Sequence, residues 1–294
     1  MPRAATGRPA WVPDWLESDC SPMTRPPRSG RFPAGLDSLS PSSRAATGVQ
    51  RPQQPQRPLH EATTDAARRV VSSGLGLDSS AVRARMVERL RADGIRCEPV
   101  LQAFNTVQRH LFVDSALAAQ AYEDTSLPIG LQQTISKPSV VARMLTLLFD
   151  GDNARVSGSL GRVLEVGTGC GYQTALLALL GSRVLSIERL KPLHDKARDN
   201  LVGWRAGDVR LVYGDGRLGH APRAPYDSLV AAAGGADLPA AWVEQLAVGG
   251  RLVAPMFDAA AGGQMLLVID KRSDGLHRRL AEAVHFVPLK SGTE

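Results

Sequence analysis

The chain has 294 residues, of which 43% are apolar, enough for one large globular domain with extra segments or for two small domains. No apolar run approaches the ~18 residues of a transmembrane helix, and the first residues lack the apolar stretch of a signal peptide, so we expect a cytoplasmic protein with no membrane contact. The formal net charge of +6 is concentrated in residues 1–60, which contribute +4, so the remainder has no basic excess and no nucleic-acid partner is expected.

Residues 1–78 are predicted to be a disordered extension rich in proline and arginine. Residues 1–60 hold eleven of the twenty prolines, and eight arginines against four acids. Residues 51–58 are of low complexity and should be extended. A basic tail could also contact nucleic acid or an acidic protein through its arginines, and this alternative stays open beside the favoured interpretation of a solvated tail.

Residues 79–150 are predicted to form a helical section at the front of a domain that spans residues 79–294. Apolar residues recur at helical spacing after Ser79-Ser80, and Gly94 ends that helix. Residues 127–130 are expected to break the run of helices. Three further helices are expected over residues 98–107, 115–122 and 139–149, the last with Pro138 near its first turn.

After residue 160 the pattern changes to strands that alternate with helices. Strands are predicted at residues 163–166, 184–187, 209–212, 228–232, 251–254, 265–270 and 283–287, with helices at 173–180, 193–201 and 239–246. This alternation indicates an α/β fold with a doubly wound, mostly parallel sheet over residues 160–294. Ligands of such sheets bind at the carboxyl ends of the strands.

A glycine-rich loop follows the first predicted strand and precedes a helix. Its sequence is Gly167-Thr168-Gly169-Cys170-Gly171, and the sixth position is Tyr172 where a dinucleotide site would have glycine. The Gly-x-Gly-x-Gly spacing with Glu165 ahead of it is typical of methyltransferases that use S-adenosylmethionine, whose methionine end replaces the phosphates of a dinucleotide. The predicted cofactor-binding residues of this segment are Glu165, Gly167, Thr168, Gly169 and Gly171.

Two further acids complete the predicted cofactor site. Glu188 ends the second strand about 20 residues beyond the glycine loop, where an acid can accept both ribose hydroxyls. Asp215 follows the third strand between two glycines, where it could accept from the adenine amino group. The alternatives are a solvated surface glutamate and an ordinary turn aspartate. The three cysteines are widely spaced and predict neither a disulfide framework nor a metal site.

With these residues, the chain resembles the protein-L-isoaspartate (D-aspartate) O-methyltransferase family over roughly residues 80–290. The most specific match is Leu127–Gly130 followed by Gln133-Thr134-Ile135-Ser136, ahead of a proline and a helix. The other segments that carry the resemblance are Arg109–Val113, Val163–Thr174 and Phe286–Leu289.

The resemblance implies a reaction and its site residues. Members of the family transfer a methyl group from S-adenosylmethionine to the α-carboxylate of isoaspartyl residues in damaged proteins, which begins their repair. A carboxylate is ionised at pH 7, so no general base is required. The family places its active-site hydroxyl at Ser136, with Thr134 and Gln133 shaping the same loop and with Ile135 and Val287 on the substrate side. The alternative for Ser136 is that it only caps the following helix.

The chain departs from the family pattern at Gln132, where a glycine is usual, and at residues 231–235, which read Ala-Ala-Ala-Gly-Gly. Both stretches should border the substrate, so the alternatives concern the substrate. One is a methyltransferase for another carboxylate or a small molecule. The other is a non-catalytic protein that binds cofactor or nucleic acid. We expect a monomer whose partners are isoaspartyl-containing proteins and peptides.

Overall fold

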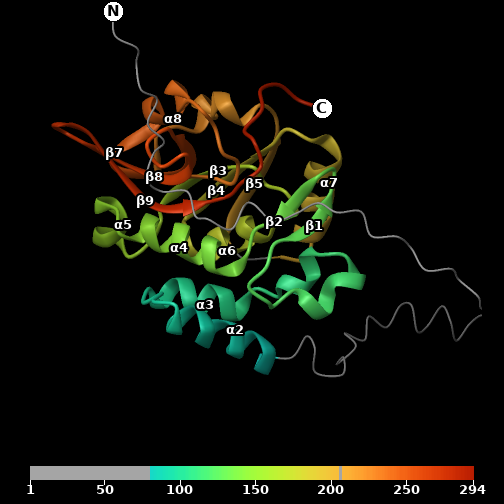
Figure 1. The fold of residues 1–294 in the computed structure, drawn as a ribbon. Helices are drawn as coiled ribbons and strands as arrows, with labels where there is room; N and C mark the ends of the chain where they lie inside the picture. The colour runs from blue at the N-terminus through green and yellow to red at the C-terminus, as the bar shows by residue number, and fades with distance from the viewer. Residues whose placement is uncertain (1–79, 205–206) are drawn as a thin grey trace, which may run out of the picture. The chain divides into compact units, whose positions relative to one another are not determined.

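A seven-stranded sheet forms the centre of the protein in a computed structural model, which describes residues 80–204 and 207–294 (Figure 1). In chain order its strands are β3 (Arg162–Val166), β4 (Arg183–Glu188), β5 (Asp208–Tyr213), β6 (Tyr226–Ala231), β7 (Leu246–Asp258), β8 (Gly263–Arg272) and β9 (Gly275–Val284). The strand order is β5-β4-β3-β6-β7-β8-β9. The pairs β7–β8 and β8–β9 are antiparallel, and the other neighbouring pairs are parallel. The predicted doubly wound, mostly parallel sheet is confirmed, while the predicted extension over residues 1–78 lies outside the described residues.

Both faces of the sheet are covered, which explains why its central strands read as continuous apolar runs. Successive residues of β3 point to opposite faces: Val163 enters one apolar cluster and Leu164 the other, and both side chains are buried. β3 lies between β4 and β6, so the chain leaves it towards one side of the sheet and later returns on the other. That reversal places a ligand site at the carboxyl end of β3.

Helices cover both faces of the sheet and build two layers on one of them. They are α2 (Ser80–Ala92), α3 (Glu98–Thr106), α4 (Pro138–Phe149), α5 (Asp152–Ser157), α6 (Tyr172–Leu180), α7 (Lys191–Leu201) and α8 (Ala240–Glu244). α4 and α6 contact both the sheet and α3, and α2 packs on α3, so α2 and α3 form the outer layer (Figure 1). None of the helices in the described ranges combines the length and the apolar character that a membrane span requires.

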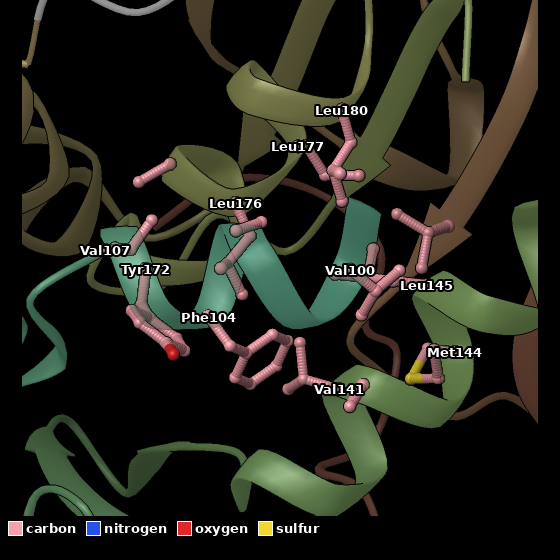
Figure 2. Packing of buried hydrophobic residues seen from close by; sticks show 14 of the residues in the cluster. Val100, Phe104, Val107, Val141, Met144, Leu145, Tyr172, Leu176, Leu177 and Leu180 are labelled. Carbon is pink, nitrogen blue, oxygen red and sulfur yellow. The ribbon is translucent and has the colours of Figure 1, made fainter. Parts of the chain in front are cut away.

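The outer layer is attached through α3. Figure 2 shows Val100 and Phe104 of α3, and Val107 directly after it, lying against side chains of α4 and α6. Phe104 has no solvent exposure, and its ring meets that of Tyr172 edge to face at a centroid distance of 6.1 Å. Burying a side chain of this size contributes about 2–3 kcal/mol. Since Tyr172 directly follows the glycine loop, the outer helices pack on the element that carries this loop.

The helical front section contains a hairpin that the sequence pattern did not predict. Where a break was expected, β1 (Leu127–Gly130) pairs with β2 (Gln133–Ile135) in an antiparallel ladder. The two residues of its turn, Leu131 and Gln132, have φ angles of 52° and 58°. Such turns normally carry Asn-Gly or Asp-Gly, so Leu-Gln gave no turn signal.

Three other elements differ from their predictions. The expected helix over residues 115–122 is a 3₁₀ helix over Ser115–Gln120. Helix α5 was not predicted, because six residues are too few to show helical periodicity. The last strand runs over residues 275–284 and not 283–287, because it is an edge strand whose exposed residues lack the expected apolar run.

Candidate active site

A pocket lies at the carboxyl ends of β3, β4 and β6. It is lined by nine of the twelve predicted site residues: Gln133, Thr134, Ile135, Ser136, Gly167, Thr168, Gly169, Glu188 and Val287. The other three, Glu165, Gly171 and Asp215, lie next to it. The structure therefore brings together segments that are far apart in the sequence, from the β1–β2 hairpin to the residues after β9.

The glycine loop forms the floor of this pocket. Gly167, Gly169 and Gly171 have φ angles of 92°, 56° and 89°, a region that side chains disfavour. A Cβ at Gly169 would also approach Ile129 of the hairpin to 3.3 Å. The hydroxyl of Thr168 hydrogen bonds to that of Ser186 at 2.6 Å, so its side chain fixes the loop to β4. The backbone of the loop is thus free to face a ligand.

Glu188 joins the glycine loop to the end of β4. Its side chain is 5% exposed and lines the pocket. One carboxylate oxygen accepts a hydrogen bond from the N–H of Gly169 at 2.9 Å, and the other accepts from the N–H of Leu190 at 3.0 Å. Each carboxylate oxygen can accept a second hydrogen bond. The carboxylate can therefore bind two hydroxyl groups in the pocket without losing its backbone partners.

Glu165 lies beneath the loop and not in the pocket wall. It is fully buried, and the hydroxyl of Thr174 donates to its Oε2 at 2.5 Å. Its Oε1 has no hydrogen-bond partner among the described residues. Burial raises the pKa of this carboxyl to about 7, although the hydrogen bond from Thr174 opposes the shift. From this position, the side chain of Glu165 can support the glycine loop from below.

Asp215 is also outside the residues that line the pocket, although its neighbour Gly216 is among them. One oxygen of Asp215 accepts from the N–H of Arg217 at 2.8 Å and caps a 3₁₀ turn over Gly216–Leu218. The other oxygen accepts from the N–H of Gly292 at 2.7 Å. The carboxylate of Asp215 therefore links the end of β5 to the end of the chain.

Ser136 and Thr134 lie where the pocket meets a second cavity. Both residues line both cavities, together with Ala232 and Val287. Ser136 does not cap α4, so the alternative role considered for it is wrong. Asp124 caps this helix instead, accepting at 2.8 Å from both the N–H and the hydroxyl of Ser139.

The second cavity carries charged side chains on its walls. Its lining includes the basic side chains Lys137 and Arg143, His285, and the acidic side chains Asp93 and Glu282. Arg143 and Glu282 form an ion pair at 3.5 Å, and both are partly exposed. The second cavity therefore carries side chains of both charge signs beside the boundary residues.

Several residues of the pocket were not predicted. They include Arg189 and Leu190, which directly follow Glu188, and Lys290, which directly follows the Phe286–Leu289 segment. The only feature of the sequence that could have indicated these three residues is their position directly after predicted site residues. Gln132, noted as a departure from the family pattern, lines the pocket as well, as do Ala232 and Ala233. The described residues contain no group of three or more side chains suited to a metal ion.

Sequence similarity to known proteins extends over most of this chain. Residues 81–294 match the family described as protein-L-isoaspartate(D-aspartate) O-methyltransferase. A protein-L-isoaspartate O-methyltransferase of Methylibium petroleiphilum is 59% identical over 265 residues, which cover 90% of this chain and 97% of that protein. One of Leptothrix cholodnii is 58% identical over 278 residues, with 92% and 97% coverage.

Solved structures give the same picture of the fold. A protein-L-isoaspartate O-methyltransferase superposes with a TM-score of 0.63 at 25% identity, covering 71% of this chain and 66% of its own. A putative enzyme of this type from Plasmodium falciparum, in complex with S-adenosyl-L-homocysteine, superposes with a TM-score of 0.59 at 24% identity, covering 70% of this chain and 97% of its own.

Proposed function

This chain belongs to the protein-L-isoaspartate(D-aspartate) O-methyltransferase family, and from that membership we propose how its pocket performs the reaction. The protein is an S-adenosylmethionine-dependent carboxyl methyltransferase, which methylates the α-carboxylate of isoaspartyl residues in damaged proteins. The observation that carries the proposal for the site is the convergence of the glycine loop and Gln133–Ser136 on one pocket.

The residues of the pocket fit S-adenosylmethionine. Glu188 would accept both ribose hydroxyls, since each of its oxygens retains an acceptor site beside its backbone partner. The backbone of Gly167, Thr168 and Gly169 would face the methionine end, where the absence of side chains at the glycines allows close approach. When bound, the cofactor supplies an electrophilic methyl group on a positively charged sulfur.

Ser136 and Thr134 would orient the acceptor carboxylate. Their position at the boundary between the two cavities allows a peptide in the second cavity to present its carboxylate to the cofactor pocket. An ionised carboxylate needs no base to remove a proton, so the task of these hydroxyls is to donate hydrogen bonds that fix its direction. Gln133 would shape the hairpin strand that carries them, and Ile135 and Val287 would supply apolar walls.

The three predicted residues outside the pocket have different positions in this proposal. Gly171 precedes α6 with a left-handed backbone, so it would keep the helix start in place beneath the cofactor. Glu165 would support the loop through Thr174. The contact between Asp215 and the adenine amino group stays a prediction: Asp215 does not line the pocket, and each of its oxygens accepts from a backbone N–H group.

We also propose the wider arrangement of the protein. Residues 79–294 would be one methyltransferase domain, in which residues 79–150 face the substrate and residues 160–294 hold the cofactor, preceded by an extension over residues 1–78. Its partners would be isoaspartyl proteins and peptides, with no nucleic acid, and it would act as a cytoplasmic monomer. The small net charge of +2 on residues 61–294 supports the expectation about nucleic acid.

The decisive experiment offers the full-length protein two peptides that differ only in an isoaspartyl or a normal aspartyl linkage, with methyl-labelled cofactor. We expect a base-labile methyl ester on the isoaspartyl peptide and none on its partner. Cofactor binding without ester on the isoaspartyl peptide would instead favour a methyltransferase for another carboxylate or a small molecule.

A further inference from the structure

The last residues of the chain form one wall of the cofactor pocket. We call residues 286–294 the strap. Four consecutive strap residues, 287–290, line the pocket, and Val287 also lines the second cavity. The strap follows β9 and belongs to no helix or long strand. Its position therefore depends on contacts made at its two ends.

The first anchor of the strap lies beside the end of β6. Gly234 donates its N–H to the carbonyl of Val287 at 2.8 Å and accepts from the N–H of Leu289 at 2.7 Å. Gln264 of β8 bonds both the N–H and the carbonyl of Phe286, at 2.7 and 3.2 Å. These contacts use neutral groups and hold the strap next to the substrate side of the pocket.

The second anchor is built around Arg189. Its Nε–H donates to the carbonyl of Gly292 at 3.2 Å, and its Nη2 donates to the carboxylate of Glu294 at 2.6 Å. The carbonyl of Arg189 also accepts from the N–H of Glu294 at 2.8 Å. Asp215 adds the hydrogen bond from the N–H of Gly292. Arg189 therefore engages the strap through its backbone and through two atoms of its side chain.

The guanidinium of Arg189 is well placed for this contact. Its side chain is 18% exposed, whereas that of Glu294 is 64% exposed. A planar guanidinium holds its N–H donors in a fixed fork, whereas an ammonium group on a flexible stem has no fixed arrangement of donors. The hydrogen bond from Arg189 holds the pKa of the Glu294 carboxyl below its usual value, so the contact is between full charges at neutral pH.

We propose that Arg189 is a positioning residue for the cofactor, which acts by holding the strap over the pocket. Val287 and Leu289 belong to the first anchor, so loss of the guanidinium of Arg189 leaves the strap from Lys290 onward less firmly held. The wall beside Glu188 then opens, while Ser136 and Thr134 on the hairpin stay in place. This inference rests on the proposed function only in that the pocket holds S-adenosylmethionine.

The first test uses full-length protein without ligand. Amide hydrogen exchange of residues 290–294 should be faster in Arg189→Gln than in the wild type, because the strap loses both hydrogen bonds from the guanidinium and only the carboxylate of Asp215 and backbone groups still hold it. The matched control is Arg183→Gln, which removes another arginine–carboxylate pair, with Asp208 at 2.8 Å, far from the strap in sequence. Unchanged exchange in Arg189→Gln would overturn the proposal.

The second test separates affinity from chemistry. The dissociation constant of S-adenosylmethionine, measured by calorimetry without peptide, should rise roughly tenfold in Arg189→Gln, as expected for lost charge-assisted hydrogen bonds. The kcat on an isoaspartyl peptide at saturating cofactor should stay within about twofold. A fall in kcat with unchanged cofactor affinity would contradict the assigned role.

Two further variants show whether Arg189 acts through the strap. Glu294→Gln should weaken cofactor binding roughly threefold, as for a partly exposed pair, and Arg189→Lys should recover part of the affinity. The effects of Arg189→Gln and Glu294→Gln should not add when combined, because both break one contact. Full additivity would mean that Arg189 binds the cofactor directly, and it would overturn the proposal. Failure of the peptide-methylation assay with wild-type protein would instead refute the function and leave the binding results intact.

Discussion

The carboxylate of Glu188 accepts the backbone N–H of Gly169 at 2.9 Å, across 19 residues of sequence. This hydrogen bond joins the end of β4 to the middle of the glycine loop. One side chain therefore fixes the shape of the loop and presents an acceptor to the pocket. Substitution of Glu188 by alanine removes both properties together, whereas glutamine keeps the shape of the side chain and one acceptor oxygen.

We expect Glu188→Gln to weaken binding of S-adenosylmethionine roughly tenfold and Glu188→Ala roughly a hundredfold. The amide retains one acceptor oxygen, while alanine leaves two backbone N–H groups without their partner. Calorimetric titration of each variant measures the difference. Equal affinity in Glu188→Ala and the wild type would remove the ribose contact assigned to this residue.

Ser136→Ala should lower kcat on an isoaspartyl peptide roughly tenfold or more while cofactor affinity stays within about twofold. The hydroxyl lies at the boundary of the two cavities and makes no hydrogen bond that caps α4. Steady-state kinetics and a separate cofactor titration check this split. Ser157→Ala, in α5 away from both cavities, is the control. Equal loss of rate and cofactor affinity would argue against the role of Ser136.

The buried carboxyl of Glu165 should make stability depend on pH. Its pKa lies at about 7 in the folded protein against an ordinary value of 4.5. Between these values the folded protein keeps a proton that the unfolded chain releases, so the free energy of unfolding falls as the pH rises from 4.5 to 7. The loss from this group reaches about 3 kcal/mol above pH 7.

Glu165→Gln removes this titration, since an amide carries no charge at any pH in this range. The variant should be more stable than the wild type at pH 8, and the difference should shrink towards zero at pH 4.5. Urea unfolding of both proteins across this range measures it. A difference that grows as the pH falls would show that the carboxyl is ionised and stabilised in the folded protein.

Gln132→Gly should stabilise the protein by about 0.5–1 kcal/mol, because Gln132 has a left-handed backbone that glycine adopts without steric cost. The midpoint of urea unfolding should rise accordingly. Gln133→Gly is the matched control: this neighbour lies in strand β2, so glycine there should be destabilising. Changes of the same sign at both positions would contradict the strain inferred for the turn.

The sequence could predict those parts of the site that depend on local pattern. A strand, a glycine loop and a helix follow one another around Gly167–Gly171, so the position of this loop at the carboxyl edge of the sheet follows from chain order. Glu188 follows from the same rule applied to the next strand. These segments converge on the pocket as expected.

Other parts could not be predicted, because they depend on contacts between distant segments. Arg189 gains its role from Glu294, which lies 105 residues away. The β1–β2 hairpin turns at Leu131-Gln132, a pair without turn preference, so its geometry is imposed by the pairing of Leu127 with Ile135. The last strand was misplaced because its residues include His277, Arg278 and Arg279, which an edge strand tolerates and a buried one does not.

Tyr172 connects the outer helices to the glycine loop, so binding of a ligand at the loop affects the stability of these helices. Its ring lies 6.1 Å from that of Phe104 and 5.6 Å from that of Phe112, and the guanidinium of Arg109 lies 4.9 Å from its centroid. A ligand that orders the glycine loop also orders the first residue of α6 and, through it, α3. At a hundred times its dissociation constant, such a ligand adds about 2.7 kcal/mol to the stability of the folded state. Bound cofactor therefore raises the thermal stability of the front helices of this enzyme, although α3 does not line the pocket.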